Sequence, residues 1–225
     1  MHILRTGLLL FSVAAFAQES ESAKRLNNAA TVFDEIMGIS EKSIPQKILD
    51  KSHCAVIVPG LKKGAFIIGA KYGRGFVTCR NKSGAGWSAP GAVRVEGGSV
   101  GFQIGGSETD VVMLVMNEKG ADRLLSNKFT IGADASAAAG PVGRTAQAET
   151  DATLRAEILT WSRARGVFAG ISLQGATLRQ DGDSLTEMYG SGTDNKTVVN
   201  GGKTAPATAK RLLDLLNKYS SRKTS

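Results

Sequence analysis

Cysteine, histidine and aromatic residues are scarce in this chain of 225 residues, which has two Cys, two His and 6% aromatic residues. Two cysteines cannot build a disulfide-rich scaffold or a four-cysteine zinc site. Because His2 lies at the extreme N-terminus, a catalytic triad would have to use His53. His53 directly precedes Cys54 at the start of an apolar run, and neighbours in a strand point to opposite faces, so a Cys–His pair is not expected.

Motifs for phosphate binding and acyl transfer are also missing. The sequence has no G-x-x-x-x-G-K-[ST], its G-x-G pieces lack a strand–turn–helix context, and residues 170–175 have the wrong spacing for a nucleophile elbow. Asp134, Glu149 and Asp151 form either a carboxylate cluster or, more simply, loop caps. We therefore expect no catalytic residues, no metal and no cofactor, and an enzyme has the least support.

No apolar run approaches the ~20 residues that a membrane-spanning helix needs. The longest lies at residues 7–16, after Arg5 and before the small-x-small pattern that ends at Ala17. This arrangement predicts a secretory signal in residues 1–17, and a retained membrane-surface helix is the alternative. We expect an exported protein of the periplasm or extracellular space, possessing one domain over residues 18–225.

Helical patterns occur at both ends of the mature chain. Apolar residues recur at spacings of three and four from Ala23 through Leu26 and Phe33 to Met37, which predicts an amphipathic helix over 21–37. Further helices are predicted over 45–51, 117–125 and 207–219.

Glycine is abundant, and nearly half of the 27 glycines lie between Gly60 and Gly106, among short β-type runs. Glycine at this density favours bulges and bends, as in a strongly curled sheet. Two more strands are predicted over 157–163 and 166–181, and residues 132–144 and 181–202 are expected to be irregular. The predicted fold class is α+β: a glycine-rich, curled antiparallel sheet or small barrel flanked by N- and C-terminal amphipathic helices.

The formal net charge of +8 comes from one stretch of the chain. Residues 51–95 contain no acidic residue, whereas charges of the two signs nearly cancel elsewhere. The basic residues of this stretch are Lys51, Lys62, Lys63, Lys71, Arg74, Arg80, Lys82 and Arg94. Since ordinary surfaces mix both signs, the stretch predicts either an anionic partner or neutralisation by acids from elsewhere in the fold. Export and the lack of interleaved aromatics disfavour nucleic acid.

Cys54 and Cys79 lie at the start of one predicted strand and at the end of the next. A hairpin-like return would bring them together, and paired thiols of exported proteins are often oxidised. A disulfide and two buried free thiols are the two alternatives.

Four long stretches resemble the SYLF family, and the resemblance covers about residues 23–190. They are VPGLKKGAFIIGAKYGRGFV, GWSAPGAVRVEGGSVGFQIGGSETDVVMLVMNEKG, KFTIGADASAAAGPVGR and ILTWSRARGVFAGISLQGA. The resemblance implies a single compact domain that binds phosphoinositides or other anionic lipids in eukaryotic members. It is also described in fungi as an actin-binding module.

In the family, an N-terminal amphipathic helix and basic surface residues are implicated in lipid binding. By position, residues 21–37 correspond to that helix, whose apolar face either inserts shallowly into lipid or packs on the sheet. The expected lipid-binding residues are Lys24, Arg25, Leu26, Phe33, Lys62, Lys63, Lys71 and Arg74. A secreted, bacterial-type protein is not expected to meet actin. An acidic protein of the cell envelope is the alternative partner to an anionic membrane surface.

Overall fold

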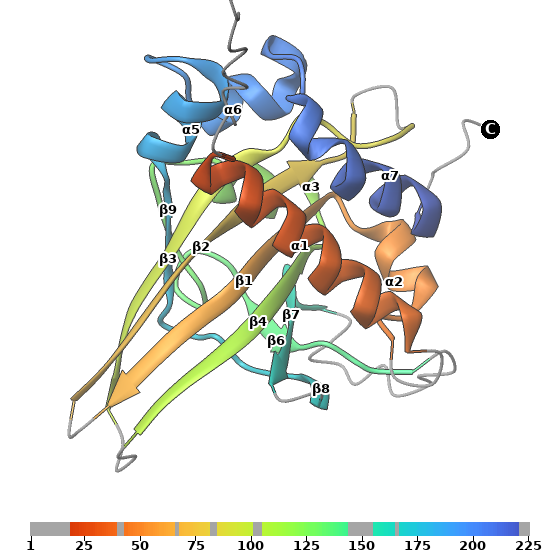
Figure 1. Ribbon diagram of the computed structural model, residues 1–225. Coiled ribbons are helices and arrows are strands. Elements are labelled where there is room, and N and C mark those ends of the chain that lie inside the picture. The colour runs from red at the N-terminus through yellow and green to blue at the C-terminus, as the bar shows by residue number, and fades with distance from the viewer. Residues whose placement is uncertain are drawn as a thin grey trace, which may run out of the picture.

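A computed structural model describes residues 19–39, 43–65, 68–81, 85–100, 105–143, 155–164 and 167–220. The predicted secretory signal lies outside these residues. Within them, one curled sheet carries helices from both ends of the chain on its outer surface (Figure 1). The predicted α+β class is therefore confirmed.

The helices begin where the sequence supplies capping groups. The Ser20 side chain accepts a hydrogen bond from the Ala23 N–H at the start of the first helix, and Asn117 does the same for Gly120. The helical segments are α1 (Glu21–Gly38), α2 (Gln46–Lys51), α3 (Glu118–Leu124), α5 (Gly182–Tyr189), α6 (Asn195–Thr197), η1 (Val198–Gly202), η2 (Ala207–Ala209) and α7 (Lys210–Tyr219).

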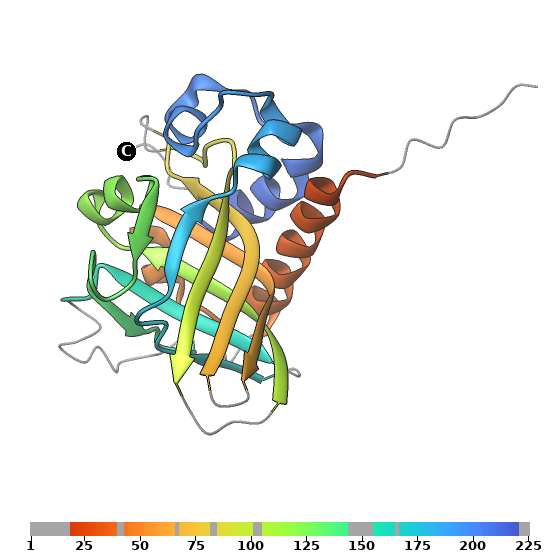
Figure 2. The ribbon, with the colours of Figure 1, turned by 90° about the vertical axis from the view of Figure 1, so that its left-hand side faces the viewer.

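The sheet has nine strands in the order β5-β9-β3-β2-β1-β4-β7-β6, with β8 also paired to β7. The strands are β1 (Cys54–Ala65), β2 (Ile68–Cys79), β3 (Gly91–Val100), β4 (Gly105–Val115), β5 (Lys128–Thr130), β6 (Ala137–Ala139), β7 (Ile158–Ala164), β8 (Val167–Gly170) and β9 (Thr177–Gln180). All pairs are antiparallel except β6–β7. The sheet curls into a half-barrel, whose two end strands, β5 and β6, are consecutive in sequence (Figure 2).

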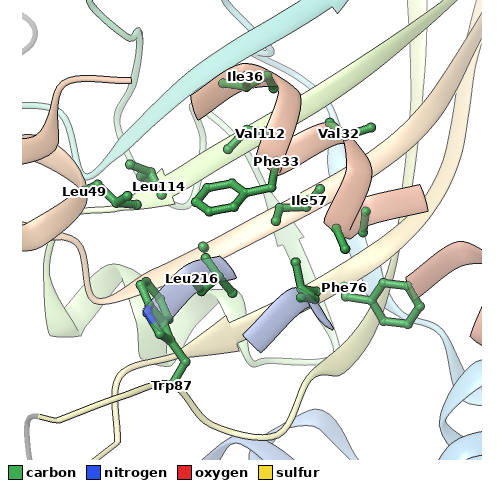
Figure 3. Close-up of a cluster of buried hydrophobic side chains, with 14 of the residues drawn as sticks. Val32, Phe33, Ile36, Leu49, Ile57, Phe76, Trp87, Val112, Leu114 and Leu216 are labelled. Atoms are coloured by element: carbon green, nitrogen blue, oxygen red, sulfur yellow. The ribbon is translucent and has the colours of Figure 1, made fainter. Parts of the chain in front are cut away.

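Strand alternation divides the core into two clusters. Ala55 and Ile57 of β1 face α1 and α7 on what we call the outer face, whereas Val56 and Val58 point to the inner face, toward α3 and β5. Figure 3 shows the outer cluster, in which Phe33 of α1 lies among side chains of the sheet and α7. Each large side chain buried in this way contributes about 1.5–3 kcal/mol to stability.

Strands β1 to β4 continue past the helices as an extension that we call the far end of the sheet (Figure 1). It comprises 62–65 of β1, 68–72 of β2, 96–100 of β3 and 105–108 of β4. At its base, β1 bulges around Gly60, whose φ is +63° and where a Cβ would lie 2.5 Å from Glu108 Oε1. A Cβ at Gly75 would lie 2.2 Å from the Ile57 carbonyl oxygen. Glycine is thus required at both positions where the strands curl against each other.

Two local predictions are wrong. The segment 181–202 was expected to be irregular but forms α5, α6 and η1, because Asp181 caps α5 and the buried Leu185 anchors it. The strand predicted over 166–181 is divided into β8 and β9 by a turn whose Leu173 is buried in the inner cluster. Residues 132–144, too poor in large side chains to be a core strand, contain only the three-residue edge strand β6.

Candidate functional site: the basic far end of the sheet

The strand register distributes the predicted basic residues over both faces of the far end. Lys63 of β1 pairs with Lys71 of β2, and Lys62 pairs with Tyr72. Lys63 follows the inner-cluster residue Leu61 by two positions, so the Lys63–Lys71 pair lies on the inner face. Lys62 and Tyr72 therefore lie on the outer face.

The Lys63–Lys71 pair is a close juxtaposition of like charges. Its flanking cross-strand neighbours are Ser107 of β4 and Gly97 of β3. Burial and the charge of Lys71 both lower the pKa of Lys63. Among the ion pairs of the described residues, none includes either lysine. Since directly opposed like charges are destabilising, this pair is a site where an external anion would be favourable.

Lys62 has a more mixed environment on the outer face. It is directly opposite Glu108 in β4 as well as Tyr72 in β2. Tyr72 is 47% exposed, and its hydroxyl accepts a hydrogen bond from Arg74 Nε at 3.1 Å. This face therefore offers an exposed aromatic ring beside a lysine.

Arg74 is neutralised by acids that follow β9. Its guanidinium lies 3.2 Å from Asp181 and 3.0 Å from Asp183. Asp181 is buried and also caps α5 through Ser184. For Arg74, the structure therefore supports the second alternative, in which the fold supplies counter-charges.

The four predicted residues of α1 are not collected at the far end. Lys24 pairs with Glu21 at 3.0 Å, and Arg25 donates to the Ser184 hydroxyl at 3.2 Å. Leu26 and Phe33 are 0% exposed and belong to the outer cluster between α1 and the sheet, where Figure 3 shows Phe33. In the docked helix these two side chains are core residues, as the packing alternative expects, and their contact with lipid stays a prediction.

Cys54 and Cys79 are directly opposed in β1 and β2 and are joined by a disulfide. The neighbouring Arg80 stacks on Trp87, 3.9 Å from the ring centroid, and donates to carbonyls of Leu49 and Ser220. The disulfide therefore lies beside the junction that holds the ends of α2 and α7.

A polar groove of about 470 Å³ between α1 and the sheet was not predicted. Inside it, Asp110 accepts a hydrogen bond from the Gly60 N–H at 3.0 Å and pairs with Arg163 at 2.7 Å. Arg163 also pairs with Glu35 of α1. Burial raises the pKa of Asp110, the Gly60 hydrogen bond opposes the rise and the charge of Glu108 adds to it. These residues are remote in sequence, and only the alternating acids at 108 and 110 gave any signal.

Neither the far end nor the groove holds a recognisable catalytic arrangement. In the described ranges, no group of three or more His, Cys, Asp or Glu residues could hold a metal ion. The helices in those same ranges are all too short or too polar to span a membrane. The chemistry that remains is that of charged and aromatic side chains able to bind a partner.

A family model described as "Ysc84: Las17-binding protein actin regulator" matches residues 96–219. An SH3 domain-containing protein of Schizosaccharomyces pombe is 35% identical over 182 residues, which cover 79% of this chain and 42% of that protein. Protein YSC84 of Saccharomyces cerevisiae is 29% identical over 202 residues, which cover 88% of this chain and 42% of that protein. SH3 domain-containing YSC84-like protein 1 of Homo sapiens is 28% identical over 200 residues, which cover 88% of this chain and 58% of that protein. The chain thus spans about half the length of these relatives.

Proposed function

Because the chain belongs to the Ysc84 (SYLF) family, we propose that it is a non-enzymatic binding module that docks on an anionic lipid surface through the far end of its sheet. The observation that carries the proposal is the Lys63–Lys71 pair. Two opposed ammonium groups that form no ion pair with the described residues lower the cost of binding an anion, because the anion relieves their repulsion. The phosphate-bearing headgroups of anionic phospholipids are the ligand class we favour.

Lys62 and Tyr72, on the outer face, also favour docking with the far end of the sheet toward the lipid surface. Tyrosine suits the headgroup region of a bilayer because its ring is apolar and its hydroxyl polar. Lysine can extend its ammonium group to the headgroups while its stem stays near apolar material. At ~1 kcal/mol for each basic residue near an anionic surface, Lys62, Lys63 and Lys71 together would raise affinity on the order of a hundredfold.

Helix α1 has a supporting role in this proposal. Insertion of its apolar face would require Leu26 and Phe33 to leave the core, where each is fully buried. Uncovering a buried Leu or Phe costs about 1.5–3 kcal/mol apiece. We therefore place the lipid contact on the lysines of the far end and keep α1 docked.

Sedimentation with vesicles of graded anionic content tests the proposal. We expect pelleting to rise with anionic lipid and to fall at high salt, because screening weakens exposed charges. The double variant Lys63→Gln/Lys71→Gln should bind roughly tenfold more weakly or worse. The matched control Lys47→Gln/Lys119→Gln removes two exposed lysines from α2 and α3 and should bind as the unmodified chain does. Equal pelleting with neutral and anionic vesicles would refute the proposal.

A protein-interaction module of the cell envelope, with an acidic partner, is the second candidate function. A separate alignment of cations on the outer face of the sheet favours it. A single dominant protein adduct after crosslinking in intact cells would support this candidate, whereas recovery of lipid alone would favour the first. Export through the signal in residues 1–17 is part of both candidates.

A further inference from the structure

Four cations stand in cross-strand register on the outer face of neighbouring strands. Arg74 of β2 pairs with Arg94 of β3, Arg94 pairs with Arg179 of β9, and Arg179 pairs with Lys128 of β5. We call these four residues the cationic ladder. With strands ~4.8 Å apart, the ladder spans roughly 14 Å. Figure 2 shows its strands side by side below the blue helices that follow β9.

Acids of the chain neutralise the ladder incompletely. Arg94 and Arg179 share one carboxylate, Glu96, at 2.9 and 3.2 Å through their Nε atoms. The Arg94 contact lacks hydrogen-bond geometry. No ion pair of the described residues includes Lys128. Because Arg74 pairs with Asp181 and Asp183, the ladder's uncompensated positive charge lies on the part formed by Arg94, Arg179 and Lys128.

We propose that the cationic ladder is a docking strip for an extended acidic segment of a partner protein. Arginine presents a planar fork that matches a carboxylate. The positions of Glu96 and Asp183 mark where carboxylates already contact the ladder. At ~3.3 Å per residue, about four or five residues of extended chain cover it, so an acidic peptide fits its length.

Partial exposure favours a peptide over a membrane as the occupant. The side chains of Arg74, Arg94 and Arg179 are 28%, 38% and 40% exposed. Arg94 and Arg179 pair with Glu96 on the sheet, and Arg74 pairs with Asp183 of α5, so all three are held beside other parts of the fold. A narrow chain can follow the ladder, whereas a flat bilayer would meet the far end first.

Fluorescence anisotropy of a labelled decaglutamate peptide with the full chain tests the proposal. Binding is expected at low salt, with no binding of decalysine. The variant Arg94→Gln/Arg179→Gln should bind decaglutamate roughly tenfold more weakly. It removes two ion pairs to the peptide, each of which raises the affinity a few-fold. The matched control Lys47→Gln/Arg155→Gln, which removes two exposed cations elsewhere, should have no effect.

Glu96→Gln gives an outcome that a folding defect cannot mimic. Removing the internal carboxylate frees Arg94 and Arg179, so decaglutamate should bind several-fold more tightly. Weaker or unchanged binding by this variant would overturn the proposal. Equal affinity for a sulfated polysaccharide or DNA would also overturn it, because only a general polyanion surface would then remain.

The ladder and the far-end lysines can be separated experimentally. Lys63→Gln/Lys71→Gln should retain decaglutamate binding, and Arg94→Gln/Arg179→Gln should retain vesicle binding. Loss of vesicle binding in the arginine variant, with peptide binding intact, would assign the ladder to lipid and refute the docking strip. Failure of vesicle binding alone would refute only the lipid proposal.

Discussion

Lys63 and Lys71 show how a single pair of residues can oppose stability and serve binding. Their ammonium groups are placed together by strand register, with glycine and serine as the next neighbours across the sheet. Replacing either lysine would relieve a repulsion that the folded chain otherwise tolerates. Retention of such a pair is understandable if an anion binds there.

We predict that Lys71→Gln raises the free energy of unfolding by roughly 0.2–1 kcal/mol at neutral pH, the range for opposed cross-strand charges. The pKa of Lys63 is lowered from its usual 10.5 by burial and by Lys71. The unfolded chain therefore binds this proton more tightly, so the penalty is present at neutral pH and is lost as pH rises through the lowered pKa. Urea denaturation at several pH values should show the advantage of the variant shrinking in alkaline solution.

Lys47→Gln is the control for this measurement, because it removes an exposed lysine without an opposed charge. It should change stability by less than about 0.5 kcal/mol at every pH. A Lys71→Gln variant less stable than the unmodified chain at neutral pH would contradict the prediction.

At the scale of elements, α1 is fastened to the sheet by both apolar and charged contacts. Phe33 fills the outer cluster, while Arg163 connects Glu35 of α1 to Asp110 of β4. The arginine and the aspartate are only 21% and 20% exposed. Removing one partner of an ion pair at this depth leaves the other charge partly buried and unpaired, which costs more stability than breaking a surface pair does.

We predict that Arg163→Gln lowers the free energy of unfolding by about 1–3 kcal/mol, because it leaves Asp110 without its cation. The loss should be smaller in acid, where a carboxyl with a raised pKa is protonated first. Chemical denaturation at two pH values measures both effects. Lys24→Gln breaks the exposed pair with Glu21 and should cost no more than about 0.5 kcal/mol. Similar losses in the two variants would contradict this account of α1.

The disulfide is the covalent connection between β1 and β2. It joins residues 25 apart in sequence, and closing such a loop stabilises a fold by roughly 3 kcal/mol. We predict a loss of that size on reduction, measured by denaturation with and without reductant. Titration of the unfolded, unreduced chain should find no free thiol. Cys54→Ala/Cys79→Ala should be insensitive to reductant, and two reactive thiols in the unreduced chain would refute the bond.

At the scale of the whole molecule, the half-barrel places the cationic ladder and the Lys63–Lys71 pair on different surfaces. Helices cover the outer face at one end, the cationic ladder crosses that face beside α5, and the lysine pair lies on the inner face at the far end. Binding at one surface therefore leaves the other free. If both proposals hold, the chain is expected to bind vesicles and an acidic peptide at the same time.

Removal of residues 1–17 should leave this architecture unchanged. The predicted cleavage after Ala17 precedes Ser20, which caps α1, and Ser22, whose hydroxyl donates to Glu187 at 2.7 Å. We predict that N-terminal sequencing of protein from its native host begins at Gln18 and that the mature chain unfolds at the same temperature as full-length protein. Recovery of an intact Met1 would refute the processing.

The sequence by itself determined the terminal helices, the curl of the sheet and the family. The spacing of Leu26 and Phe33 predicted α1, and dense glycine predicted a curled sheet, because both signals are local. Short polar helices such as α5 escaped prediction, since their anchoring residue Leu185 has meaning only against the outer cluster.

Only the tertiary structure decided which charges act together. Residues 51–95 looked like one basic patch, but strand alternation sends Lys62 and Lys63 to opposite faces. Asp181 and Asp183 neutralise Arg74 from more than a hundred residues away in sequence. The ladder likewise depends on the placement of β9 and β5 beside β3. Pairing across a sheet is set by register and curvature, which no local pattern of residues encodes.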